Sequence, residues 1–110
     1  MKKYFVLYKA TPEQFKKWMS GSKEEMQKGM DAWNTWMASH KSHFVDEGGM
    51  LSKVKKISAK GIEDTHNDIG SYAIVQAESL QAAAEIFKDS PHFEGDSWIE
   101  VMEMPVWPKQ

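Results

Sequence analysis

Apolar and aromatic side chains recur along residues 22–44 at gaps of four, three, four, three and four positions. They belong to Met26, Met30, Trp33, Met37, His40 and Phe44. Residues three and four apart share one face of an α-helix, so this pattern predicts a long amphipathic helix over residues 22–44. Ser22 and Glu25 have the spacing of a capping box, which places the start of the helix at Ser22. Gly48-Gly49 is expected to close the region.

Four further segments are rich in β-branched and aromatic residues and are predicted to be strands. They are residues 3–9, 50–57, 71–77 and 97–104. A short helix is expected at residues 11–20, capped by Thr11, and a second amphipathic helix at residues 79–91, capped by Ser79 and ended by Pro91. The polar residues 58–70 are predicted to form a loop.

The resulting order β-α-β-β-α-β is the split pattern of ferredoxin-like domains. The predicted fold class is therefore α+β, with a four-stranded antiparallel sheet that carries the helices on one face. A chain of 110 residues suits one domain, which we expect to span residues 1–110.

The first predicted strand is apolar on both of its faces. Phe5 and Leu7 alternate with Tyr4, Val6 and Tyr8, although two helices can cover only one side of the sheet. We therefore expect a homodimer in which the sheets of two copies face each other as a dimeric α+β barrel. The alternative is a monomer whose loop and C-terminal tail cover the second face.

Composition excludes several classes of function. Fourteen Lys and Arg are interspersed with sixteen Asp and Glu, for a net charge of −2, and no basic stripe points to nucleic acid. The absence of cysteine excludes disulfides, thiolate metal sites and a cysteine nucleophile. No apolar run is long enough for a signal peptide or a membrane span, so we expect a cytoplasmic protein without a membrane partner.

Six segments together form a recognisable combination. They are KYFVLY at residues 3–8, Trp33-x-x-Trp36-Met37, Gly48-Gly49-x-Leu51, residues 70–80, Ser90-Pro91-His92-Phe93, and Trp98-Ile99-Glu100-Val101. This combination resembles the YCII-related (YciI-like, DGPF-domain) family of dimeric α+β barrel proteins, and it extends over nearly the whole chain. The Asp-Gly-Pro-Phe segment of one branch is replaced here by residues 63–68. The resemblance implies a dimeric fold; some relatives are proposed enzymes, including a dehydrochlorinase of a chlorinated aromatic.

His66 and Asp68 form the first candidate site. A histidine held by a carboxylate can act as a general base near neutral pH, and the predicted loop would place this pair at one end of the sheet. The alternative is a solvated turn, because Asn and Asp are common turn formers.

Glu100 is the second candidate, because it alternates with Trp98 and Met102 on one face of a predicted strand. Apolar neighbours are expected to raise its pKa and suit it to acid–base work. The alternative is an ion pair with a strand lysine. His92, beside the proline turn, is expected to line the same end of the sheet.

Three aromatic residues are the candidate ligand-binding set: Tyr8, Tyr72 and Trp33. They would give a planar ligand apolar walls and hydroxyl groups; the alternative for each of them is an ordinary place in the core. His40 and His43 have a spacing that metal sites use, but imidazoles also favour a helix C-terminus for dipole reasons, so no metal or cofactor is predicted.

We therefore predict a small homodimeric protein that binds an apolar or aromatic metabolite and carries out cofactor-independent lyase or isomerase chemistry. His66 with Asp68 would move the proton, Glu100 or His92 would assist, and Tyr8 and Tyr72 would orient the ligand. One alternative is a non-catalytic ligand-binding or accessory module. Another is a cofactor-free oxygenase with a cavity around Trp33 and Trp36.

Overall fold

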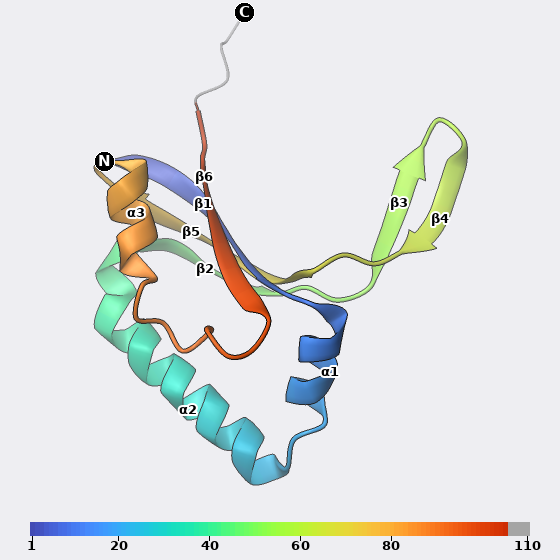
Figure 1. The fold of residues 1–110 in the computed structure, drawn as a ribbon. Helices are drawn as coiled ribbons and strands as arrows, with labels where there is room; N and C mark the ends of the chain where they lie inside the picture. Colours follow the sequence, from blue (N-terminus) through green and yellow to red (C-terminus); the bar gives the residue numbers. More distant parts are fainter. Residues whose placement is uncertain (106–110) are drawn as a thin grey trace, which may run out of the picture.

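The computed structural model describes residues 1–105. Its elements are β1 (Lys2–Ala10), α1 (Pro12–Met19), α2 (Lys23–His40), a 3-10 turn η1 (Lys41–His43), β2 (Phe44–Met50), β3 (Val54–Ser58), β4 (Gly61–Thr65), β5 (Ile69–Ala77), α3 (Leu80–Ile86) and β6 (Ser97–Glu103). Figure 1 shows these elements in chain order. No helix within residues 1–105 combines the length and apolar character of a membrane span.

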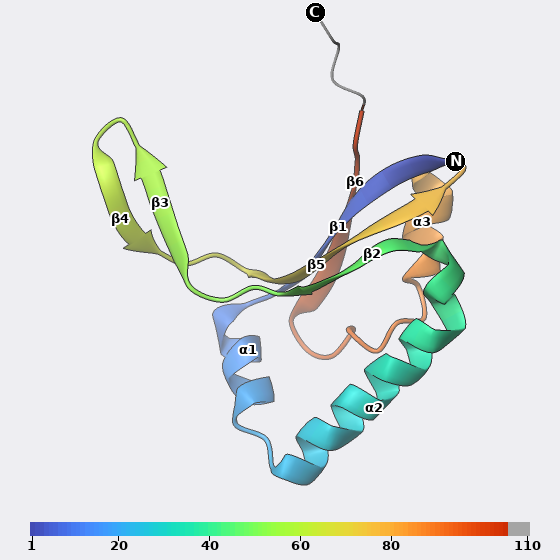
Figure 2. The same cartoon turned by 180° about the vertical axis from the view of Figure 1, so that it is seen from behind.

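Four of the strands form one antiparallel sheet in the order β2-β5-β1-β6. The first strand in sequence is therefore central and the last lies at an edge, as in a ferredoxin-like sheet. In both Figure 1 and Figure 2, α1 and α2 lie on one side of this sheet. The predicted α+β fold class is confirmed.

The core lies between the sheet and the helices. On β1 the side chains of Tyr4, Val6, Tyr8 and Ala10 are buried against the helices, while the alternate side chains are only half-buried. The same alternation on β5 buries Ala73, Val75 and Ala77. From α2 and α3, Trp36, Met37, Ala83, Ile86 and Phe87 complete this core. We call the other side of the sheet the open face.

The long predicted helix begins where expected but ends early. The Ser22 hydroxyl accepts a hydrogen bond from the Glu25 amide at 3.1 Å, and the Glu25 carboxylate accepts from that hydroxyl at 3.3 Å. The helix ends at His40 rather than at residue 44, and a 3-10 turn follows. Phe44 still packs on the core, but from the first position of β2, which is why the apolar pattern extended too far.

The second strand of the sheet is not the predicted one. Residues 50–57 were expected to form it, but β2 (Phe44–Met50) pairs with β5 instead. This strand contains Asp46, Glu47 and two glycines, which have low strand propensity. Its pairing with β5 is interrupted by bulges, and at Gly48 φ is 74°. A Cβ atom there would overlap the carbonyl oxygen of Tyr72, so the close approach of the two strands needs glycine.

Residues 58–70 are not a loop. β3 and β4 form a separate two-stranded sheet in which Ile57 lies opposite Ile62, and residues from Ile69 onward already belong to β5. The ion pairs Lys55–Asp64 and Lys56–Glu63 join the two strands. In both views this hairpin projects from one end of the sheet, away from α1 and α2 (Figures 1 and 2).

Candidate functional site

Tyr8, Trp33 and His92 come together on the helix side of the sheet. The Tyr8 ring meets that of Trp33 edge-on at 5.1 Å between centroids and that of His92 at 5.6 Å. Phe87 lies against Tyr8 at 5.8 Å, and Trp18 of α1 lies 5.6 Å from His92. We call these five residues the aromatic cluster. Trp18, Trp33 and His92 are only half-buried, so one side of the cluster reaches solvent.

The hydroxyl of Tyr8 is buried without a hydrogen-bond partner among the described residues. The residue is 3% exposed, and burial raises its pKa far above the ordinary value of 10.0. Tyr8 therefore keeps its proton at every physiological pH. It offers a hydrogen-bond donor that the surrounding protein leaves unused.

His92 is held by two backbone carbonyl groups. Its Nε2 lies 2.9 Å from the carbonyl oxygen of Lys9 and 3.1 Å from that of Trp98. Both partners are acceptors, so we infer that Nε2 carries the proton and donates to them. Burial lowers the pKa of His92 below its ordinary 6.5, against the opposing effect of the two carbonyl groups. Near pH 7 the ring is therefore neutral, and its Nδ1 is the basic nitrogen.

The loop between α3 and β6 carries His92 and is fixed by a polar network. The Ser97 hydroxyl donates to the carbonyl oxygen of His92 at 2.7 Å. The buried side chain of Gln14 accepts from the Asp96 amide at 3.2 Å and thereby ties α1 to this loop. No sequence signal singled out Gln14 or Trp18, because both lie on a helix that is distant from His92 along the chain.

Asp68 and Glu100 meet on the opposite side of the sheet, around Lys9. The Lys9 ammonium lies 3.1 Å from an Asp68 carboxylate oxygen and 3.2 Å from a Glu100 oxygen. Trp98 Nε1 donates to that same Glu100 oxygen at 2.9 Å. Desolvation favours a lower pKa for Lys9, but the hydrogen bonds and charges of the two carboxylates outweigh it and raise the pKa. We call these four residues the charged corner.

The expected upward pKa shift of Glu100 is wrong. The Trp98 N–H bond, followed by the Lys9 bond, lowers the pKa of Glu100, and its side chain is 44% exposed. Glu100 is therefore ionised near neutral pH and forms the ion pair that the sequence left as the alternative. Lys9 could have been found from its alternation with Phe5 and Leu7, which places it on the face of Glu100 in the neighbouring strand.

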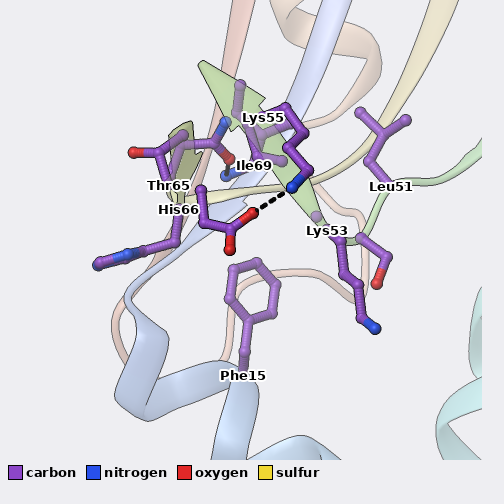
Figure 3. A pocket seen from close by; sticks show the side chains of 12 residues that line it. Phe15, Leu51, Lys53, Lys55, Thr65, His66 and Ile69 are labelled. Carbon is purple, nitrogen blue, oxygen red and sulfur yellow. Dashed lines mark hydrogen bonds and ion pairs between the residues drawn. The ribbon is translucent and has the colours of Figure 1, made fainter. Parts of the chain in front are cut away.

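His66 does not join Asp68. The Asp68 carboxylate contacts Lys9, and no hydrogen bond or ion pair links it to His66 in the described residues. His66 is exposed and lines a groove of about 860 Å³ between Phe15 of α1 and the base of the β3–β4 hairpin (Figure 3). The dashed line in Figure 3 is the Lys55–Asp64 ion pair, which joins two of the charged side chains that line this groove.

Tyr72 lies on the open face, where its ring stacks on that of Phe5 at 6.0 Å. Tyr8 and Tyr72 therefore lie on opposite sides of the sheet and cannot orient the same bound ligand. The His40 ring stacks on Trp36 at 4.4 Å, and its Nδ1 is 2.8 Å from the Trp36 carbonyl oxygen. Within residues 1–105, no three His, Asp or Glu side chains are close enough to hold a metal ion.

Comparison with known proteins identifies the fold. No family model matches this chain, and no curated protein matches it. Among eight matching solved chains is the 5-chloro-2-hydroxyhydroquinone dehydrochlorinase of Burkholderia phenoliruptrix AC1100, in complex with 2,5-dihydroxybenzoquinone. The match covers 89% of this chain and 90% of that one, with a TM-score of 0.53 and 16% identity. At this identity the likeness shows the fold alone: the chain shares the α+β fold of that dehydrochlorinase.

Proposed function

We propose that this protein binds a small aromatic metabolite at the aromatic cluster and moves a proton on it without a cofactor. The observation that carries the proposal is the buried Tyr8 hydroxyl, which has no partner of its own among the described residues. Leaving such a group unsatisfied costs about 1–3 kcal/mol, and an oxygen atom of a bound ligand would remove this penalty. The surrounding rings suit a planar molecule.

The proposed chemistry is a tautomerisation. The unprotonated Nδ1 of His92 takes a proton from a carbon or hydroxyl group of the ligand, and the Tyr8 hydroxyl donates a hydrogen bond to the ligand oxygen that gains negative charge. The imidazolium then returns the proton to a different ligand atom, so atoms and charge balance. The lowered pKa of His92 keeps the ring unprotonated, as a base near neutral pH requires.

The fold comparison supports the class of ligand. The dehydrochlorinase of similar fold acts on a chlorinated hydroxyhydroquinone and was solved with a dihydroxybenzoquinone. Both compounds are small rings that carry several oxygen atoms. The proposed ligand of the present chain belongs to the same broad class of phenols and quinones.

A thermal-shift screen with phenols, hydroxybenzoquinones and hydroxybenzoates tests the proposal. A ligand at 100 times its dissociation constant stabilises the folded state by about 2.7 kcal/mol, which gives a measurable shift. For a hit, Tyr8→Phe should weaken binding at least tenfold. Tyr72→Phe removes the same hydroxyl from the opposite face and should leave binding unchanged. Equal losses in both variants, or a panel without hits, would contradict the proposal.

A non-catalytic binding module is the second candidate. It is favoured by the charged corner, because Lys9 already forms ion pairs with the two carboxylates that were expected to take part in proton transfer. NMR detection of hydrogen–deuterium exchange on a bound ligand separates the two candidates. Exchange that depends on His92, and stops in His92→Gln, supports the enzyme; binding without exchange supports the module.

We further propose that the chain works as a homodimer through its open face. Phe5, Leu7, Tyr72 and Ile74 are half-buried apolar side chains on this face. The chain exposes 8487 Å², whereas a compact monomer of this mass exposes about 6,200 Å². The excess of roughly 2,300 Å² exceeds the ~800 Å² per partner that a stable interface buries.

A further inference from the structure

The β3–β4 hairpin carries an apolar pair that nothing in the described chain covers. Ile57 and Ile62 face each other across the two strands and are 75% and 69% exposed. Every other residue of the two strands except Val54 is exposed as well. Two large apolar side chains in register on an exposed ribbon have the character of a contact surface.

The hairpin has little of its own to stabilise it. An isolated two-stranded ribbon is marginally stable in water, and this one packs no face on the core of the described residues. Its two cross-strand ion pairs are exposed, so each contributes at most about 1 kcal/mol. A further surface is therefore needed to hold the ribbon in one position.

The position of the hairpin identifies the side from which that surface comes. In Figures 1 and 2 the hairpin rises away from α1 and α2, which cover the helix side of the sheet. It thus projects on the side of the open face.

Charge and area both favour a second copy of this chain. Residues 51–65 contain four lysines and two carboxylates, a net charge of +2, whereas the charged corner on the open face carries one lysine and two carboxylates. The area that the chain exposes beyond that of a compact monomer is larger than the area that one partner of a stable interface buries. We propose that the β3–β4 hairpin is a dimerisation arm that docks on the partner copy through Ile57 and Ile62. This inference rests on the proposed homodimer.

The test measures the dimer dissociation constant by sedimentation velocity over a concentration series. The double variant Ile57→Thr/Ile62→Thr keeps β-branched residues in the ribbon and should raise the dissociation constant at least tenfold. The control Lys56→Thr/Glu63→Thr changes a cross-strand pair on the other face of the ribbon. The dimer dissociation constant of this control should stay within twofold of the wild-type value.

Hydrogen exchange of the β3 and β4 amides supplies an independent measurement. In the wild type, protection of these amides should rise at least tenfold between concentrations below and above the dissociation constant. The arm alone would be overturned if the wild type dimerises, the isoleucine variant has the same dissociation constant, and the hairpin amides gain no protection. The hairpin would then be free to contact a different partner. A wild type that is monomeric throughout would overturn both the arm and the homodimer, while the ligand screen would still test the aromatic cluster separately.

Discussion

The Tyr8 hydroxyl is the polar group of the core that most needs an explanation. Burial of a hydroxyl without a partner costs free energy, and phenylalanine would fill the same space without that cost. Tyr8 and Tyr4 lie on the same face of β1, with Val6 between them, and both residues are almost fully buried. Of these two, however, only Tyr8 has a hydroxyl that is both buried and without a partner among the described residues. The proposed role of Tyr8 in binding would account for a hydroxyl that the folded chain alone does not need.

Tyr8→Phe should therefore increase the free energy of unfolding of the unliganded protein by about 1 kcal/mol, because an unsatisfied buried hydroxyl is removed. Tyr4→Phe is the matched control and should change it by less than about 0.5 kcal/mol. Urea unfolding with linear extrapolation measures both values. Destabilisation by Tyr8→Phe would show that the hydroxyl has a partner in the folded state.

The lowered pKa of His92 gives a second prediction, for stability against pH. In the unfolded chain the ring titrates near 6.5, and in the folded chain it titrates lower. Just below pH 6.5 the unfolded chain therefore binds more protons, and the free energy of unfolding falls as the pH drops through this range. In His92→Gln the free energy of unfolding should fall less between pH 7.5 and pH 5.5. Urea titrations at a fixed protein concentration measure this decrease. Identical slopes in both proteins would contradict this assignment.

Proximity along the chain was the basis on which the sequence paired His66 with the carboxylate of Asp68. The Asp68 carboxylate forms an ion pair with Lys9 on β1 instead. Tyr8, Trp33 and His92 were each selected, yet their meeting depends on how α2 and the loop before β6 pack on the sheet. That packing depends on tertiary contacts, which no pattern of neighbouring residues in the sequence predicts.

Among the elements, β2 shows how tertiary pairing overrides local propensity. Asp46, Glu47 and two glycines argue against a strand, and β5 nevertheless supplies hydrogen-bond partners for it. The helices α1, α2 and α3 and the strands β1, β5 and β6 followed from periodicity and capping, because these depend on neighbouring residues. The hairpin was missed because its turn, Ala59-Lys60, lacks the Asn-Gly or Asp-Gly pair that marks such turns in a sequence.

Gly48 is the position where β2 depends on a single residue. Its φ of 74° and the overlap that any Cβ atom would make with the Tyr72 carbonyl oxygen leave no room for alanine. Gly48→Ala should lower the free energy of unfolding by about 2–4 kcal/mol. Gly49→Ala is the matched control, since a Cβ there meets nothing within 4 Å, and it should cost less than about 1 kcal/mol. Equal urea midpoints for the two variants would contradict the role of the bulge.

For the whole molecule, the decisive feature is a sheet covered on one side only. Leu7 lies at the centre of the open face, opposite Tyr72 on β5 and Glu100 on β6. Leu7→Lys should leave each chain folded, because this side chain is only half-buried, but should convert the proposed dimer to a monomer at micromolar concentration. Light scattering coupled to size exclusion measures the mass. Met30→Lys, on the exposed surface of α2, is the control and should remain dimeric.

Lys9 makes contacts on both sides of the sheet. Its carbonyl oxygen accepts the hydrogen bond from His92, while its ammonium group holds the carboxylates on the opposite surface. A displacement of Lys9 would therefore alter both the proposed base, His92, and the proposed subunit contact on the open face. Self-association and binding of the metabolite should accordingly be thermodynamically linked. If dimerisation raises the affinity for the metabolite by some factor, the bound metabolite must raise the affinity of dimerisation by the same factor.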